Sequence, residues 1–268
     1  MFSPIYRLLP LFVPLLLASC GGKGKGDADS VATDSVPDYV GQIIDAVAHN
    51  DSVRFAKMVN YPLERPYPLR DIENEQEMEQ YYPVMMDDSI RTAIGHSKPK
   101  QWEQVGWRGW TLHEGEWVWA DSLIYSVNHV SRRELSERDS LQRAEIATLP
   151  QAMRSGWTPE LCLKGQEGDI YRVDWHKENP DSTTYRLSIY RKGSDLKGTP
   201  TAVLYGGMEL QGSEGNRWYT FTNTEGMTAI YGADVSGDEG KAIQITTPNG
   251  GEIMENVTPA YWRDLISK

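Results

Sequence analysis

Hydrophobic positions recur at helical spacing in the first part of the chain. Between 38 and 50 they mark one buried helix face: Val40, Ile43, Ile44 and Val47. The stretch Asn50-Asp51-Ser52 then has the residue types of a helix cap and predicts the start of a second, short helix. Asn74 with Glu77 predicts a capping box and a third helix that continues to about Ile94.

After Pro99 the period changes from that of a helix to that of a strand. Alternation predicts three strands, over 105–110, 117–119 and 123–130. We expect the turn between the first two at His113-Glu114-Gly115-Glu116, a sequence without the helical pairing of a zinc site. Ser131 predicts the cap of a charged helix that ends near Ala147.

The remainder of the chain is strand and turn almost throughout. Seven stretches predict strands: Asp169–His176, Thr183–Arg191, Thr201–Leu210, Trp218–Thr222, Met227–Asp234, Lys241–Thr247 and Glu252–Val257. Short strands with Gly- and Asn-rich turns between them predict an antiparallel meander, as a small barrel or a sandwich. The stretch 157–164 is predicted to join the two parts, and 261–266 to form a short closing helix.

The first part resembles the NTF2-like fold, in which a bent sheet wraps around helices. The resemblance covers roughly residues 38–130 and is carried by Ala48-His49-Asn50-Asp51, Tyr61-Pro62-Leu63, Ile72-Glu73-Asn74-Glu75 and the Trp-rich hairpin at 105–119. We therefore expect an α+β protein. It would combine an NTF2-like domain with a curved antiparallel sheet over 38–150 and an antiparallel β domain over 151–268.

The N-terminus has the pattern of an export signal over residues 1–19. Arg7 precedes an apolar run of about ten residues, which is too short for a spanning helix of roughly 20. Leu17-Ala18-Ser19-Cys20 resembles the lipobox of bacterial lipoproteins. The resemblance implies that Cys20 becomes the mature N-terminus and carries acyl chains, two or more of which hold a protein firmly on a membrane.

The stretch 20–37 is predicted to be a lipidated, flexible tether, because its Gly, Ser, Asp and Lys cannot bury a core. Such a chain reaches roughly 20–25 Å. Among lipoproteins, Asp after the cysteine retains the protein at the inner membrane, so Gly21 favours the outer membrane. We expect a lipid-anchored protein of the cell envelope. The sequence does not distinguish the periplasmic from the external face of the membrane.

Composition narrows the partners and the chemistry. The formal charge is −11 and no Lys/Arg-rich run stands out, which argues against nucleic acid. Beside Cys20 the chain has only Cys162, which Leu161 and Leu163 flank as in a buried apolar site. Asp234-Val235-Ser236-Gly237-Asp238 lacks the Gly and Glu of a calcium loop and predicts a turn. We expect no catalytic residue, no metal and no cofactor.

Five tryptophans between 102 and 119 are the main candidates for a binding surface. Tryptophan faces stack on sugar rings, and they also fill sheet cores. The candidate ligand-binding residues are Trp107, Trp110, Trp117, Trp119 and Tyr125. We expect a non-catalytic binding or assembly module whose partners are the membrane, through Cys20, and an envelope protein or glycan. The alternatives are an NTF2-like pocket for a small ligand or an enzyme reaction, and a glycan-binding surface built from these aromatic residues.

The anchoring prediction is tested by removing the thiol. In Cys20→Ala the chain has no acceptor for acyl chains, so we expect it to leave the membrane fraction when cells are broken and fractionated. Intact mass measurement of the wild-type chain should show the added acyl groups. A Cys20→Ala chain that stays membrane-bound, or a mature chain without acyl mass, contradicts the prediction.

Overall fold

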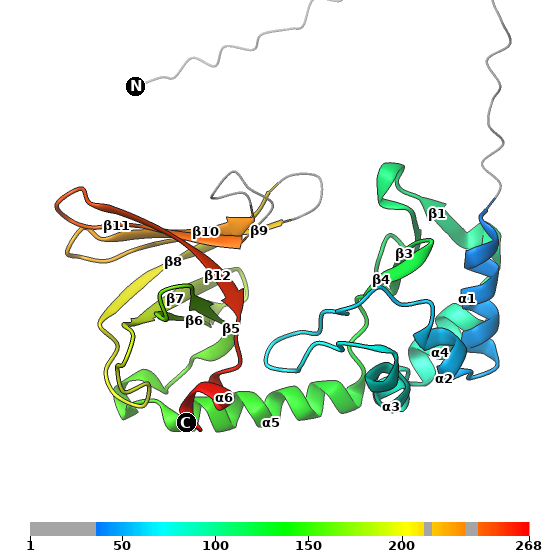
Figure 1. The fold of residues 1–268 in the computed structure, drawn as a ribbon, viewed down its shortest axis with the longest axis horizontal. Helices are drawn as coiled ribbons and strands as arrows, with labels where there is room; N and C mark the ends of the chain where they lie inside the picture. The colour runs from blue at the N-terminus through cyan, green and yellow to red at the C-terminus, as the bar shows by residue number, and fades with distance from the viewer. Residues whose placement is uncertain (1–35, 212–215, 234–240, 268) are drawn as a thin grey trace, which may run out of the picture. The chain divides into compact units, whose positions relative to one another are not determined.

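The computed structural model describes residues 36–211, 216–233 and 241–267 (Figure 1). The predicted signal segment, Cys20 and the turn at 234–238 lie outside the described residues. No helix in the described part of the chain combines the length and the apolar character needed to cross a membrane.

Four helices open the described chain: α1 (Asp38–Ala48), α2 (Ser52–Ala56), α3 (Glu75–Met85) and α4 (Asp88–Gly95). The side chains of Asp51 and Asn74 accept hydrogen bonds from the first turns of α2 and α3, as predicted. The prediction of one helix continuing to Ile94 is wrong. The Asp87 side chain accepts from the backbone N–H groups of Ser89 and Ile90 and starts α4 as a separate helix.

A four-stranded antiparallel sheet follows in the order β1-β2-β3-β4. Its strands are β1 (Trp102–Gln104), β2 (Trp110–Leu112), β3 (Val118–Asp121) and β4 (Leu123–Val127). The predicted strand over 105–110 is wrong, because Gly106–Arg108 forms a 3₁₀ turn, and Gly109 has φ +82°. A Cβ atom at Gly109 would collide with the carbonyl of Ala120, so only glycine allows this turn to lie against β3.

The inner face of this sheet packs against the helices. Buried side chains from both form one apolar core, to which the sheet contributes Trp102, Trp110, Leu112, Val118, Ala120, Ile124 and Val127. The space between the sheet and the helices is therefore occupied by core side chains. Helices and an antiparallel sheet agree with the expected α+β class, while the NTF2-like assignment and the boundary at residue 150 stay predictions.

The second part is a closed, eight-stranded antiparallel barrel, so of the two predicted forms the barrel is the one observed. Its strands are β5 (Thr158–Gly165), β6 (Ile170–Asn179), β7 (Ser182–Tyr190), β8 (Ala202–Gln211), β9 (Asn216–Thr222), β10 (Thr228–Ala233), β11 (Lys241–Thr246) and β12 (Glu252–Pro259). Consecutive strands pair, and β12 pairs with β5 to close the ring. Apolar and aromatic side chains fill the interior, among them the predicted inward residues Leu187 and Ile189.

The prediction missed β5, which occupies the stretch expected to join the two parts. Pro159 sits near its start, where the register with β6 shifts, because proline cannot donate to the ladder. Side chains on both faces of β5 are buried, so its sequence shows no alternation. The predicted closing helix is confirmed as α6 (Trp262–Ile266).

The helix α5 (Arg132–Thr148) connects the sheet to the barrel (Figure 1). Ser131 and Glu134 form the predicted capping box. The buried face of the helix is polar, with Glu134, Gln142 and Glu145 as its buried residues. Glu134 and Glu145 lie eleven positions apart, which places both on one side of the helix and roughly 16 Å apart along its axis.

Both buried carboxylates of α5 are hydrogen-bonded. Glu134 accepts from the Arg65 Nε at 2.8 Å, and Glu145 accepts from the Tyr67 hydroxyl at 2.9 Å. Glu145 also accepts from Arg172 on β6, at 3.3 Å. Because a buried carboxylate is stable only when it is paired, these contacts fix the segment around 65–67 and the outer face of β6 on the helix.

On that outer face Asp174 lies between two arginines. It accepts from Arg172 Nε at 2.9 Å and from Arg186 Nη2 at 2.7 Å, and all three residues are buried. The indole of Trp262 on α6 covers Arg172, with 4.7 Å from the guanidinium to the ring centroid. The barrel is therefore joined to α5 and α6 through a paired, water-excluded charge cluster.

Removing the central charge of this cluster tests its importance. In Asp174→Asn two buried guanidinium groups lose their shared carboxylate, and we expect the free energy of unfolding to fall by about 3–5 kcal/mol. Asp264→Asn is the matched control, because Asp264 pairs with Arg70 at an exposed site and its loss costs less than about 1 kcal/mol. Urea denaturation of both variants measures the difference, and equal small losses would contradict the role of the cluster.

Candidate ligand-binding site

The outer face of the four-stranded sheet carries a group of aromatic and charged side chains, of which Asp121 and Tyr125 are exposed and Arg108 and Trp119 are half-buried. Trp119 on β3 and Tyr125 on β4 lie side by side, with ring centroids 6.4 Å apart and planes inclined by 38°. Arg108 and Asp121 flank them along a depression of about 770 Å³. We call Arg108, Trp119, Asp121 and Tyr125 the aromatic shelf.

Hydrogen bonds and charges hold Tyr125 and Arg108 in this arrangement. The Tyr125 hydroxyl donates to the Arg108 carbonyl at 2.6 Å and so ties the 3₁₀ turn to β4. The Arg108 guanidinium lies 6.0 Å from the centroid of the Trp119 ring, at the limit of a cation–π contact. Partial burial raises the pKa of Tyr125, so at neutral pH its hydroxyl stays protonated.

The turn before β3 determines where the Trp119 indole lies. Gly115 has φ +90°, and a Cβ atom there would collide with the indole ring of Trp119. The Asn128 side chain donates to the Gly115 carbonyl and accepts from the Ser126 hydroxyl, which secures the turn from the β4 side. The indole therefore rests directly on the glycine backbone, and its position depends on this residue having no side chain.

The structure separates the five predicted binding residues. Trp119 and Tyr125 come together on the outer face, and Tyr125 is 38% exposed. Trp110 points inward and is 7% exposed in the core. Trp117 packs against that core and against the ring of His129, with centroids 5.1 Å apart. The Trp107 side chain lies outside the described residues.

Sequence reasoning did not single out Arg108, Asp121 or Asn128. Asp121 is the outward residue two positions after Trp119, so strand alternation is the signal that places it beside the indole. For Arg108 and Asn128 the sequence has no comparable pattern, because neither residue lies in a strand. Arg108 reaches the shelf from an irregular turn, and Asn128 follows the end of β4.

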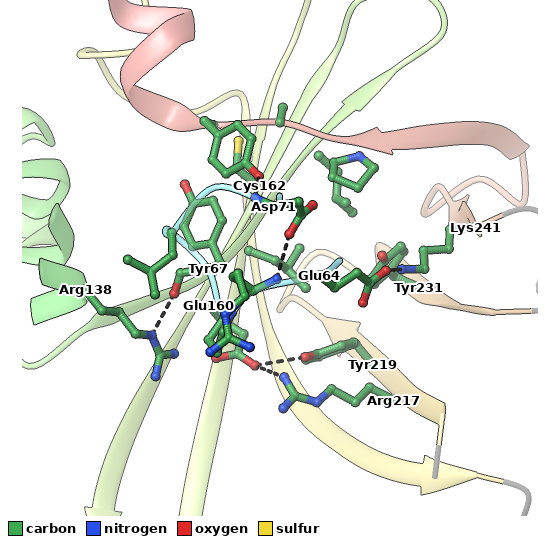
Figure 2. Close-up of a pocket in the computed structure, with 18 of the residues that line it drawn as sticks. Glu64, Tyr67, Asp71, Arg138, Glu160, Cys162, Arg217, Tyr219, Tyr231 and Lys241 are labelled. Carbon is green, nitrogen blue, oxygen red and sulfur yellow. Dashed lines mark hydrogen bonds and ion pairs between the residues drawn. The ribbon is translucent and has the colours of Figure 1, made fainter. Parts of the chain in front are cut away.

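A second depression lies at the end of the barrel and has a volume of about 780 Å³ (Figure 2). We call it the barrel-mouth cavity. Figure 2 shows Arg217 and Tyr219 of β9 both reaching Glu160 of β5. On another side, Glu64 pairs with Lys241 at 3.6 Å. Asp71 accepts from the Arg65 backbone N–H at 2.8 Å, and burial raises the pKa of its carboxyl.

The described residues of the cavity wall include no cysteine paired with a histidine. Cys162 lies in the wall, but its thiol is buried, and burial raises its pKa to about 12. Among the described residues that line the cavity there is no histidine. Within the described residues no three His, Cys, Asp or Glu side chains gather as a metal site. The lining offers hydrogen bonds and charge, which are the means of binding a ligand.

A methyl group at Gly115 tests how Trp119 is held. Gly115→Ala puts a Cβ atom into the indole, so we expect the ¹⁹F resonance of 5-fluorotryptophan at position 119 to shift or broaden. Gly193→Ala is the control, because Gly193 has φ +81° but nothing within 4 Å of its Cβ position. Both variants carry the backbone strain of about 1–3 kcal/mol. A Trp119 resonance unchanged in Gly115→Ala would show that the indole does not rest on this glycine.

Comparisons with known proteins assign no family to this chain. No protein-family model, no curated protein and no solved structure matches it. Its function therefore has to be inferred from the aromatic shelf and the barrel-mouth cavity.

Proposed function

We propose that the chain is a non-catalytic binding module of the cell envelope that captures a glycan on the aromatic shelf. The observation that carries the proposal is the pair formed by Trp119 and Tyr125, which lie together on the outer face beside Arg108 and Asp121. The proposal retains acyl chains on Cys20 as the anchor and the NTF2-like fold as the family of the first part.

The shelf has the chemistry that a sugar ring requires. One face of a pyranose presents C–H groups, which gain from burial against an aromatic ring, while its rim carries hydroxyl groups. Arg108 supplies donors and Asp121 supplies acceptors at the edge of the aromatic pair, where the hydroxyl groups would lie. Flat anionic ligands such as nucleic acid are disfavoured by the net charge of −11.

Binding, as opposed to catalysis, is supported by how the charged groups are held. Asp121 has no histidine or second carboxylate beside it among the described residues that line the shelf. An acid–base reaction needs a proton donor and an acceptor within reach of the same substrate bond. The expected alternative of a pocket inside the sheet is not supported, because core side chains occupy that space.

A panel of neutral oligosaccharides tests the proposal through tryptophan fluorescence of the full chain. We expect a saturable change for at least one sugar and a loss of affinity of about 5- to 150-fold in Trp119→Ala, because a stacking face contributes about 1–3 kcal/mol. Tyr205→Ala is the control, since Tyr205 is an exposed aromatic residue on β8 outside both depressions.

Two results would contradict the proposal. One is the absence of any fluorescence change across the panel. The other is equal loss of affinity in Trp119→Ala and Tyr205→Ala, which would place the sugar elsewhere.

A further inference from the structure

The shelf depression and the barrel-mouth cavity adjoin each other. Three residues belong to the walls of both: Ser126, Asn128 and Asn216. Ser126 lies near the end of β4, Asn128 directly follows that strand, and Asn216 is the first residue of β9. The groove thus passes from the outer face of the small sheet to the barrel, with polar side chains at the junction.

The size of this groove indicates an extended ligand. Small molecules occupy pockets of about 300–1,000 Å³, and each of the two depressions, at about 770 and 780 Å³, falls within that range by itself. A single sugar on Trp119 would leave the barrel-mouth cavity empty. A chain of sugar units would continue past Asn128 into it.

Two ion pairs lie at the barrel mouth. Glu160, whose side chain is 10% exposed, holds the guanidinium of Arg217, which is 60% exposed. Glu64 and Lys241 form the second pair. Of the other two lining cations, Arg65 pairs with Glu134 and Arg138 donates to the Tyr67 carbonyl, while Asp71 adds a further carboxylate. Four cations of the described lining are thus balanced by four carboxylates, so the cavity has little net attraction for an anionic or cationic ligand, yet it presents many donors and acceptors.

Hydroxyl groups complete the polar lining. Burial and the nearby Glu64 raise the pKa of Tyr231 to about 12, so its phenol stays neutral and able to donate. Tyr261 accepts from the Asp71 backbone N–H at 2.9 Å. Guanidinium, carboxylate and phenol groups in fixed positions suit the closely spaced hydroxyl groups of an uncharged sugar.

We infer that the groove binds a neutral, linear oligosaccharide, with one ring on the aromatic shelf and the following units in the barrel-mouth cavity. This inference rests on the proposed function, because the shelf supplies the first contact. It adds the class of glycan, a linear chain without charged groups, and a second set of binding residues on the barrel.

The experiment compares chain lengths. Calorimetric titration of the full chain, purified in detergent, uses the mono- to hexasaccharide series of the sugar selected on the panel. We expect the affinity ratio of pentasaccharide to monosaccharide to exceed about tenfold, the contribution of one or two hydrogen bonds to charged groups. Arg217→Met should bring this ratio towards 1. Tyr231→Phe, which keeps the shape of the side chain, should lower it in part.

A matched control separates the groove from a general effect of charge. Arg54→Met also removes an arginine paired with a carboxylate, but on α2, outside both depressions, and should leave the ratio unchanged. An acidic oligosaccharide of equal length should bind more weakly than the neutral one.

The outcomes distinguish the inference from the proposed function. Binding that depends on Trp119 but has the same affinity at every chain length overturns the inference and leaves the proposed function standing. A length effect that survives in both Arg217→Met and Tyr231→Phe, or tighter binding of the acidic chain, also overturns it. Absence of binding at every length overturns both.

Discussion

The arrangement of this protein depends on two buried carboxylates of one helix. Glu134 and Glu145 lie on the same side of α5 and are almost fully removed from solvent. A carboxylate in such a place is destabilising unless it is paired, so the helix can be buried only where suitable donors come to it. Arg65 and Tyr67 on one segment, and Arg172 on the barrel, are those donors.

These pairs have a consequence for the binding groove. Arg65 also donates to the carbonyl groups of Val127 and His129, so the segment around it is tied to the end of β4 as well as to α5. Arg138 of α5 donates to the Tyr67 carbonyl. The wall of the barrel-mouth cavity is therefore held by charge-assisted hydrogen bonds from three directions, and it can present Asp71 in a fixed position.

The two faces of the four-stranded sheet divide its aromatic residues between packing and binding. Side chains that point to the helices, such as Trp110, are core, while Trp119 on the next strand points outward. Glycines decide the fine placement on the outer face. Gly109 lets the turn with Arg108 approach β3, and Gly115 leaves room for the Trp119 indole. A shelf that depends on such close backbone contacts is pre-organised for stacking against a ring of its ligand.

Most of the secondary structure could be predicted from the sequence, because local chemistry is enough to specify helix caps, strand alternation and turns. Asp51, Asn74 and Ser131 start their helices as side-chain caps, and seven barrel strands follow from alternation and turn residues. The prediction was wrong at two places. It missed β5, whose two faces are both buried, and it assigned a strand to the 3₁₀ turn Gly106–Arg108, whose sequence alternates as a strand does.

The candidate site was decided by the tertiary structure. The Trp-rich stretch predicted where aromatic residues gather, and only the sheet showed that Trp119 and Tyr125 share the outer face while Trp110 lies in the core. The barrel-mouth cavity brings Glu64 and Arg217 together from distant parts of the chain. Spacing along a sequence indicates which residues share a helix face or a strand face. It does not indicate which buried charges pair with one another. In this protein the pairing of α5 with the barrel sets the positions of the cavity residues.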